Sequence, residues 1–522
     1  MSKATYDAIV IGAGHNGLAA ATTLARKGKS VCVIEKQASV GGMARNCSLA
    51  GMEVPEIAHL LYNLHPKVKK ELGLGHSRAP LELRNLPSVA LSETGSHVVI
   101  REGKAELTGG RPHPQAAPFA ELMRRLTLFA GLLGQLSTKS PPALEGGLSS
   151  LETLTELAGL ARLGLDLKRM GKKDMREFLR ILLSNAYDLI LDDLEDGPLA
   201  GALAADAVRG AFAGPRSPGT VFTLMYRLSQ GGGAQLPIGG MGAVSAAFEA
   251  AARAAGVEIR TGTGVAHVCV ENDRAAGVVL EDGTEIAARA VLSNAGPMPS
   301  MKLAGAEHYD VEMVRRMRNQ RCKGTAAKVN LVLSGAPVFT GLSPELTAGR
   351  LLIAPSAAYV ERAFNPAKYG EMPKNPVIEM VIPSLTDPAL ARGGQHVLSA
   401  VVSSVPYGLQ GGWHEAARAE LAAITLATLE KYAPGIGALV TESQVLSPAC
   451  IEARTGAPGG HWHHAEMGID QILTVRPANG MARYRFGPEG YYLCGAGAHP
   501  GGDVTGLSGR NSALQLLKDG VL

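Results

Sequence analysis

The stretch from Tyr6 to Lys36, "YDAIVIGAGHNGLAAATTLARKGKSVCVIEK", constrains the fold of this chain more than any other part of it. It opens on a short apolar run that is typical of a buried parallel strand. Gly12, Gly14 and Gly17 follow, and glycines at this spacing provide a tight turn, a close backbone approach to a pyrophosphate and close packing of helix on strand. The N-terminal N–H groups of a helix over Asn16–Lys27 would face that pyrophosphate. The stretch therefore predicts a βαβ unit that binds a dinucleotide.

The second strand of this unit ends on Glu35, whose carboxylate is placed to accept hydrogen bonds from a ribose hydroxyl and would repel a phosphorylated ribose. A second glycine turn, Gly41 and Gly42, comes directly after it, followed by Arg45. Arg45 is either a bidentate partner for a phosphate or a solvated loop arginine. The predicted cofactor contacts of this region are Gly12, Ala13, Gly14, His15, Asn16, Gly17, Glu35, Lys36, Gly41, Gly42 and Arg45.

The middle of the chain carries a second nucleotide signal between Val257 and Pro297. Apolar and polar residues alternate there around turns at Asn272–Asp273 and Asp282–Gly283, which predicts a three-stranded meander that covers the nucleotide-binding sheet. Its first strand brings backbone near Val265 within reach of an adenine edge, and the turn after its last strand points back to the cofactor. A glycine turn feeding an alanine-rich helix precedes it. The predicted contacts are Gly240, Met241, Gly242, Val265, Asn294 and Ala295.

The third signal is "CGAGAHPGGDVTG" at Cys494–Gly506, where five glycines surround one aspartate. A strand precedes this stretch and a helix follows it from about Gly506. A flat ring lying on backbone needs glycines, and a helix N-terminus favours the negative charge that a reduced flavin carries. The stretch therefore predicts that the dinucleotide is FAD. Its predicted contacts are Gly495, Gly502, Asp503 and Val504.

Together, "GAGHNG" with its glutamate and "GG", "GGMGA", "LEDGTEI…LSNAGP" and "GYYLCGAGAHPGG" resemble the phytoene desaturase-like, carotenoid and retinoid oxidoreductase branch of the FAD-dependent amine oxidase fold. The stretches "GAPGGHWHHAEMGIDQI…RP" and "GRNSA" are most similar to the subfamily of pyridine nucleotide-disulfide oxidoreductase domain-containing protein 2. The resemblance covers nearly the whole chain and is weakest between about Pro87 and Pro215. It implies a tightly bound FAD, a discontinuous FAD domain and a substrate domain over the flavin.

Three residues near the C-terminus are candidates for catalysis. Relatives commonly have glycine where this chain has Asp503, which leaves a ribityl contact, a structural turn and a catalytic role open. His464 and Glu466 match an H-x-E pattern that recurs in the relatives, so they either face the substrate, positioning it or moving a proton, or are satisfied structural groups. The histidines around them lack HExxH spacing, and we expect no metal site there.

Several functions are disfavoured by what the chain contains. Its formal net charge of +4 is spread over 522 residues and calls for no nucleic-acid partner. Six cysteines without a CxxC pair argue against disulfide redox chemistry. No second strand–GxGxxG–helix unit follows, so we expect NAD(P)H to reduce the flavin inefficiently. The N-terminus carries no signal-peptide pattern, and the expected location is cytoplasmic.

A basic amphipathic stretch at Leu151–Leu194 either touches an anionic membrane or is a substrate-domain helix with a solvated face. Exposed loops should flank a helix at Phe119–Leu136. Contact with the membrane surface and a lipid-soluble substrate therefore both stay open as hypotheses.

We expect an α/β fold: a doubly wound, glutathione reductase-type FAD domain interleaved with a mixed α/β substrate domain. The FAD domain should comprise 1–85, 230–300 and 440–522, and the substrate domain with its helical lid 86–229 and 301–439. The resemblance implies hydride transfer from a substrate carbon to the flavin, with desaturation of an apolar or polyene-like molecule as the first hypothesis. An amine or amino-acid-derivative oxidase, an isomerase using reduced flavin and a flavin-loaded binding protein without turnover remain alternatives. Electron acceptor and oligomeric state stay open.

Overall fold

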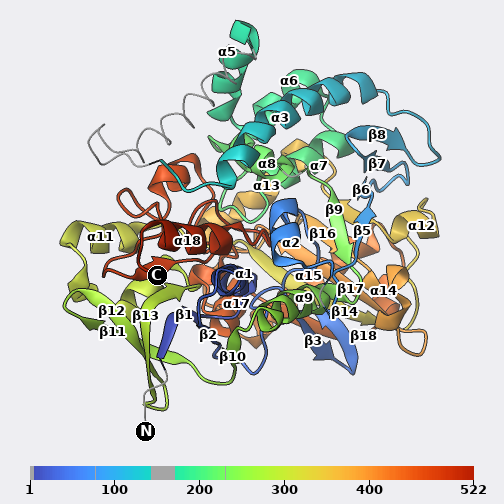
Figure 1. Cartoon of the computed structure of the whole chain (residues 1–522). Helices are drawn as coiled ribbons and strands as arrows, with labels where there is room; N and C mark the ends of the chain where they lie inside the picture. The colour runs from blue at the N-terminus through green and yellow to red at the C-terminus, as the bar shows by residue number, and fades with distance from the viewer. Residues whose placement is uncertain (1–4, 77, 143–170, 230) are drawn as a thin grey trace.

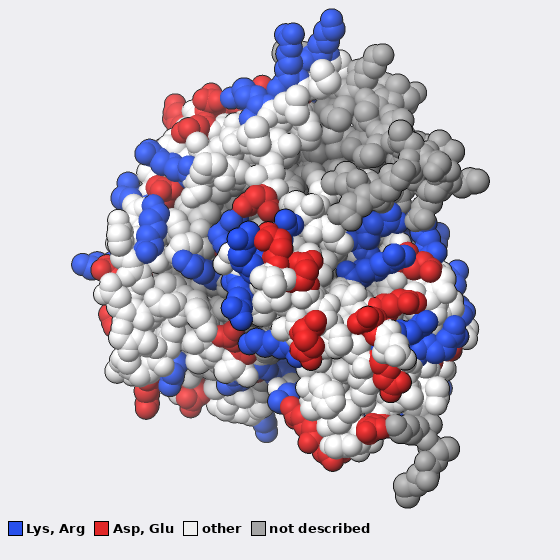
Figure 2. Space-filling view, turned by 90° about the vertical axis from the view of Figure 1, so that its left-hand side faces the viewer, with Lys and Arg blue, Asp and Glu red and all other residues white. Residues whose placement is uncertain are grey.

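The structure is a computed structural model of the whole chain, and it describes residues 5–76, 78–142, 171–229 and 231–522. Two large sheets lie side by side, and a layer of helices stands over them (Figure 1). The face shown in Figure 2 carries acidic and basic side chains interspersed among uncharged ones. The α/β class predicted from the sequence is confirmed.

The first sheet has the strand order β10-β2-β1-β13-β12-β11, with β19 also paired to β13. The pairs β2/β1, β10/β2, β1/β13 and β13/β19 are parallel, as expected of a nucleotide-binding sheet. The strands are β1 (Thr5–Ile11), β2 (Val31–Ile34), β10 (Glu258–Arg260), β11 (Val265–Glu271), β12 (Arg274–Leu280), β13 (Glu285–Ser293) and β19 (Tyr491–Leu493).

The predicted meander is present, but its predicted placement was wrong. Strands β11, β12 and β13 form it, and Asn272 and Asp273 at its first turn have φ values of +50° and +57°. It does not form a separate layer over the sheet, because β13 is long enough to serve both: its residues from Ala287 onward pair with β1, while Glu285–Ala287 pair with β12. The meander therefore extends the nucleotide-binding sheet sideways.

Helices α1 (His15–Ala25), α9 (Gly240–Ala254) and α18 (Leu507–Lys518) pack against the first sheet. Small residues let α1 and α18 come very close: a Cβ on Gly509 of α18 would lie 1.8 Å from the carbonyl oxygen of Asn16. The N-terminal, middle and C-terminal parts of the chain thus share one hydrophobic core. Two further helices, α10 (Pro297–Ala304) and α11 (Val311–Asn319), add Met301, Met313 and Met317 to it.

The second sheet has the order β18-β14-β17-β16-β15-β6-β7-β8. Helix α15 (Glu415–Glu430) covers one side of its core. Its strands are β6 (Ser88–Ala90), β7 (Val98–Arg101), β8 (Lys104–Leu107), β14 (Ala326–Leu333), β15 (Arg350–Ile353), β16 (Ile378–Val381), β17 (His396–Ser403) and β18 (Val440–Leu446). Two small antiparallel pairs complete the strands: the hairpin of β3 (Asn46–Leu49) with β4 (Met52–Pro55), and the pair of β5 (Leu83–Leu86) with β9 (Ala234–Pro237), which is distant in the sequence.

The helical layer has a core of its own. The helix predicted at Phe119–Leu136 is confirmed as part of α3 (Ala116–Ser137). Of the basic amphipathic stretch Leu151–Leu194, residues 151–170 lie outside the described part of the chain, and the rest contains α5 (Gly171–Leu182) and α6 (Ala186–Asp193). The remaining helices of the layer are α7 (Pro198–Ala207), α8 (Thr220–Leu228) and α13 (Ala357–Phe364).

The predicted division into domains remains a prediction, but three elements bear on its boundaries. β18 lies in the segment 440–522 and yet pairs with β14 of the second sheet. Conversely, α11 and the second half of α10 follow residue 300 and pack on the first sheet. The other short helices are α2 (Pro66–Leu72), α12 (Pro344–Thr347), α14 (Pro383–Thr386), α16 (Ile436–Leu439) and α17 (Pro448–Thr455).

Candidate active site

The turn between β1 and α1 forms one wall of the site. Gly12 has a φ of +92°, which residues with a side chain rarely adopt. A Cβ on Gly14 would lie 2.7 Å from Nδ2 of Asn294, and a Cβ on Gly17 would lie 2.1 Å from the carbonyl oxygen of Gly12. The turn is therefore shaped by glycines, and Gly17 lets α1 pack on the preceding backbone.

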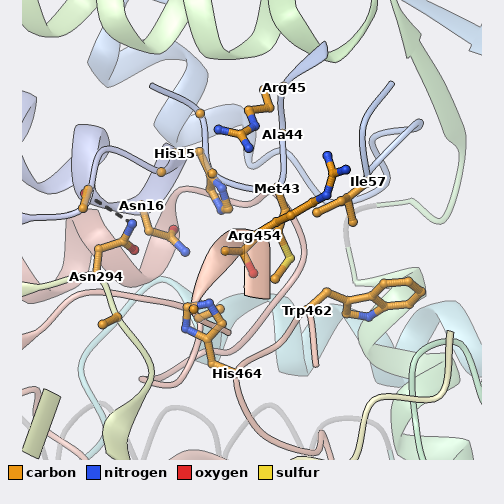
Figure 3. Close-up of a pocket in the computed structure, with 18 of the residues that line it drawn as sticks. His15, Asn16, Met43, Ala44, Arg45, Ile57, Asn294, Arg454, Trp462 and His464 are labelled. Carbon is orange, nitrogen blue, oxygen red and sulfur yellow. Dashed lines mark hydrogen bonds between the residues drawn. The ribbon is translucent and has the colours of Figure 1, made fainter. Parts of the chain in front are cut away.

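A cavity of about 450 Å³ lies against this turn, a size within the range of small-molecule sites. In Figure 3, His15, Asn16 and Asn294 lie to one side, the guanidinium groups of Arg45 and Arg454 in the upper part, and His464 at the bottom. The structure thus brings all three predicted regions to one cavity. The predicted residues that line it are Gly12, Gly14, His15, Asn16, Glu35, Lys36, Gly41, Gly42, Arg45, Val265, Asn294, Ala295, His464, Asp503 and Val504.

Glu35 is held at the end of β2 by backbone donors. Its Oε2 accepts a hydrogen bond from the Ala13 N–H at 2.7 Å, and its Oε1 accepts one from the Gln37 N–H at 2.9 Å. Lys36 points to Glu281, with its Nζ 2.8 Å from Oε1. The acid expected to meet a ribose is thus fixed beside the glycine turn.

The polar groups beside the turn suit a bound diphosphate. His15 Nε2 and both amide atoms of Asn16 are buried and have no hydrogen-bond partner among the described residues, although buried polar groups normally have one. Helix α1 begins at His15 after Gly14 as its N-cap, and no side chain caps it, so its first N–H groups are open to an acceptor. Burial lowers the pKa of His15 to about 4, which keeps its ring neutral. These residues fit FAD.

Other predicted contacts lie behind the cavity wall. Gly240 and Gly242 pack on the side chain of Asn46, whose Oδ1 accepts the Gly242 N–H at 3.0 Å. Gly495 packs on the carbonyl of Asn294, where an added Cβ would approach to 2.5 Å. These glycines serve close packing of the walls. The predicted site residues that do not line the cavity are Ala13, Gly17, Gly240, Met241, Gly242, Gly495, Gly502 and Glu466.

Arg45 does not stand alone in its part of the cavity. It forms an ion pair with Glu56, and Arg454 from the end of α17 approaches the other oxygen of the same carboxylate, with Nη1 2.7 Å from Oε1. Glu56 is only 2% exposed. Its carboxylate fixes two arginines at one wall, and Arg45 is therefore not a solvated loop residue.

The remaining wall of the cavity was not predicted from the sequence. It consists of residues that follow β4, a residue after α7, one strand of the second sheet and the tryptophan of the histidine-rich stretch. They have no motif spacing, and Arg209 lies in the segment where the family resemblance is weakest, so only the three-dimensional structure brings them together. These residues are Ile57, Ala58, His59, Leu60, Tyr62, Arg209, Val401 and Trp462.

A buried ionic network backs this wall. Arg350 donates to Oε2 of Glu379 at 2.6 Å and to Oδ1 of Asp206 at 2.5 Å. Its charge, together with that of Arg209, keeps the pKa of the Glu379 carboxyl well below its usual value, although burial alone would raise it. Lys328 on β14 is 1% exposed, and its Nζ has no hydrogen-bond partner among the described residues. Burial lowers its pKa strongly.

Asp503 joins the glycine-rich stretch to this wall. Its φ of +63° explains why glycine is an alternative at this position. Oδ2 accepts a hydrogen bond from Asn63 at 2.8 Å, and Oδ1 lies 3.3 Å from Nη1 of Arg209. The carboxylate is therefore partnered by two side chains.

His464 and Glu466 are close in the sequence but have different surroundings. His464 lines the cavity, and burial with the nearby charge of Arg476 lowers its pKa to about 3. Glu466 instead accepts the backbone N–H of Phe212 at 3.2 Å and lies 3.3 Å from Nε2 of His461. It is placed to hold the histidine-rich stretch rather than to face the cavity.

Within residues 5–76, 78–142, 171–229 and 231–522, no group of three or more His, Cys, Asp and Glu residues has the geometry to hold a metal ion. In the same ranges, no helix is both long and apolar enough to cross a membrane. All six cysteines lie in these ranges as free thiols, and the cavity is lined by none of them.

Comparison with known proteins places this geometry in a family. Residues 17–329 match the family described as flavin containing amine oxidoreductase. The chain is 33% identical to the pyridine nucleotide-disulfide oxidoreductase domain-containing protein 2 of Rattus norvegicus, over 99% of this chain and 94% of that protein. It is 25% identical to the phytoene desaturase (neurosporene-forming) of Rhodobacter capsulatus, over 99% of this chain and 96% of that protein.

A solved structure of a putrescine oxidase variant superposes with a TM-score of 0.61 at 16% identity, covering 99% of both chains. At this identity the match shows the fold alone. The amine oxidase fold expected from the sequence is thereby confirmed.

Proposed function

From the premise that the chain belongs to the flavin containing amine oxidoreductase family and is an FAD-dependent oxidoreductase, we propose that it dehydrogenates a carbon–carbon bond of an apolar or polyene-like small molecule. The observation that carries this proposal is that the glycine turn opens into the same cavity as a wall rich in apolar side chains. That wall includes Met43, Ile57, Leu60 and Val401. The similarity to a phytoene desaturase over nearly the whole of both chains supports the same reaction class.

The residues beside the turn would hold the cofactor. Glu35 is placed for a ribose, His15 and Asn16 for the diphosphate, and Arg45 offers a cation at the same cavity. When bound, FAD supplies an acceptor for the hydride of a substrate C–H bond. The protein's own part is to bind and orient the substrate, exclude water and direct the proton lost from the neighbouring carbon.

His464 is suited to orienting the substrate. With a pKa of about 3 its ring is neutral at pH 7 and a weak base, whereas an efficient general base has a pKa near the working pH. Its ring can still exchange hydrogen bonds with a substrate, since Nδ1 is buried without a partner among the described residues. The released proton then goes to water or to another group.

The wall opposite the glycine turn disfavours an amine. A protonated amine entering the cavity would meet the guanidinium group of Arg209, and like charges in a buried site repel strongly. Desaturation of an uncharged bond avoids this conflict. Amine oxidation is therefore the weaker of the two flavin reactions for this cavity.

Anaerobic bleaching of the flavin absorbance band tests the proposal. The purified, FAD-loaded protein is mixed with lipid and polar fractions of a host extract, and the bleaching fraction is analysed for a product lighter by two hydrogen atoms. We expect the lipid fraction to bleach the band. Bleaching by the polar amine fraction alone would show that the reaction is amine oxidation.

Nicotinamide cofactors should be poor reductants of this protein. The sequence offers one dinucleotide-binding unit, and no cysteine of the described residues lines the cavity to relay electrons. Under the same anaerobic conditions, NADPH and NADH should leave the flavin band intact over minutes. Bleaching within seconds by either would overturn this expectation.

A further inference from the structure

We infer that the substrate carries a carboxylate, which binds Arg209 and Tyr62 at the wall opposite the glycine turn. This rests on the proposed function, because it concerns the same cavity and adds a charged end to the apolar molecule. The two residues, with Trp462 behind Arg209, are called the anion wall below.

Arg209 lines the cavity, and not all of its N–H groups have a hydrogen-bond partner. Its Nη1 is 3.3 Å from Asp503, while Oε1 of Glu379 lies 3.5 Å from Nε without hydrogen-bond geometry. Nε is buried and has no hydrogen-bond partner among the described residues. A guanidinium carries five N–H donors in a planar fork that matches a carboxylate. Nη1 and Nε are directed at Asp503 and Glu379, and Nη2 has no hydrogen-bond partner among the described residues, so Nη2 is the group that is available to a ligand.

Tyr62 provides the second donor. It is 5% exposed and lines the cavity, and its hydroxyl has no hydrogen-bond partner in the described part of the chain. Burial raises the pKa of this hydroxyl, so it stays protonated and can donate. Leaving such a group unpaired is costly, and a ligand oxygen would satisfy it.

Aromatic rings hold the guanidinium in place. The Cζ atom of Arg209 lies 4.3 Å from the ring centre of Tyr62 and 5.2 Å from that of Trp462. A cation over aromatic rings is stabilised by the ring electrons. The space beside these rings that could receive a substrate ammonium ion is therefore taken by a cation of the protein itself.

The charges that pair directly around the anion wall balance one another. Three arginines, Arg209, Arg227 and Arg350, form ion pairs with three carboxylates, Asp206, Glu379 and Asp503. Burial lowers the pKa of Lys328 strongly, so this residue does not add a fourth fixed positive charge. The anion wall therefore recognises a carboxylate through the N–H and O–H donors that it leaves unpaired, and not through an excess of buried positive charge.

The neighbouring wall residues Leu60 and Val401 are apolar. An apolar chain with an acidic end matches both chemistries of this region. The substrate class is thus an apolar carboxylic acid.

Binding of matched eight-carbon probes to the FAD-loaded protein tests this inference. Octanoate, octan-1-ol and octylamine are titrated under air, and perturbation of the visible flavin spectrum is recorded. We expect saturable perturbation by octanoate, at least about tenfold weaker binding of the alcohol and none of the amine. Equal binding of octanoate and the alcohol, or tighter binding of the amine, would overturn the inference.

Variants locate the site. Arg209→Gln and Tyr62→Phe should each weaken octanoate binding, the former by about tenfold or more, and Arg209→Lys should restore part of the affinity. Arg227→Gln is the matched control, because Arg227 belongs to the same network and packs 3.8 Å from the Tyr62 ring centre but does not line the cavity. Octanoate affinity that falls equally in Arg209→Gln and Arg227→Gln would contradict the assignment.

The outcomes separate this inference from the proposed function. If the FAD-loaded protein is bleached by a neutral lipid but does not bind octanoate, the proposed function stands and the carboxylate inference is wrong. If it binds octanoate beside its flavin but no lipid fraction bleaches it, the anion wall stands and the proposed function is wrong.

Discussion

At the scale of single residues, the site depends on side chains whose partners are now visible. Asp503 occupies a left-handed backbone position and links the glycine-rich stretch to Arg209 and Asn63. The sequence left a ribityl contact, a structural turn and a catalytic role open for it, and these contacts add a fourth: the carboxylate orients a cation of the opposite wall. His464 lines the cavity, whereas Glu466 supports the backbone at Phe212.

Replacing Asp503 by asparagine should strengthen carboxylate binding. Asparagine tolerates the φ of +63° and can keep the contact with Asn63, so the fold and FAD content should remain. Loss of the negative charge frees Nη1 of Arg209 and removes repulsion of the ligand. Octanoate should therefore bind about three- to tenfold more tightly, measured by the flavin spectral titration.

Asp503→Glu is the control, since it keeps the charge and should not tighten binding. Weaker octanoate binding to Asp503→Asn would show that the carboxylate supports the ligand rather than competing with it.

At the scale of elements, much of the fold could be predicted because strand, glycine turn and helix are encoded in contiguous residues. The glycine turns at Gly12, at Gly240–Gly242 before the alanine-rich helix, and at Gly506 each lead into a helix, as predicted. The place of the meander could not be predicted, because it depends on β13 pairing with strands on both sides. The wall with Arg209 and Tyr62 was missed for a similar reason: its residues come from distant elements and share no local pattern.

Close contact between α1 and α18 should make Gly509 irreplaceable. An alanine Cβ there would meet the carbonyl of Asn16 at 1.8 Å, so the helices must separate next to the cofactor turn. We expect Gly509→Ala to lower the free energy of unfolding by about 3 kcal/mol and to reduce FAD content.

Gly131→Ala in α3 is the matched helical control. A Cβ at Gly131 meets nothing within 4 Å, and alanine should stabilise the protein by about 0.5–1 kcal/mol. Thermal unfolding and flavin absorbance of both variants check the pair. Equal stability of the two variants would contradict the described packing.

At the scale of the whole molecule, the site exists only because the two sheets meet. The first sheet supplies the glycine turn and Glu35, and the second supplies Val401 and, behind it, Glu379 and Lys328. Distant parts of the chain therefore form one cavity with a polar cofactor side and a mixed apolar and cationic far wall.

Buried neutral histidines should make the stability of the molecule fall in mild acid. Burial lowers the pKa of His15, His59 and His499 to about 4 and that of His464 to about 3, against 6.5 for a free imidazole. The unfolded chain then binds more protons than the folded one between about pH 6.5 and 4. Stability should be constant above this window and fall by about 1.4 kcal/mol per pH unit for each histidine within it.

Urea unfolding of the FAD-loaded protein at pH 7.5, 6.0 and 5.0 measures this dependence. His499→Gln, which lies outside the cavity lining, should reduce the slope between pH 6.0 and 5.0. A free energy of unfolding that stays constant from pH 7.5 to 5.0 would show that these rings are not neutral in the folded state.

The most direct test of the central claim, that one cavity unites the flavin with an acidic apolar substrate, is a crystal structure of the FAD-loaded protein with octanoate. We predict dinucleotide density against Gly14 and Glu35, and octanoate density in the same cavity with its carboxylate about 3 Å from the guanidinium of Arg209. Octanoate bound elsewhere, or with its carboxylate turned away from Arg209, would contradict the account.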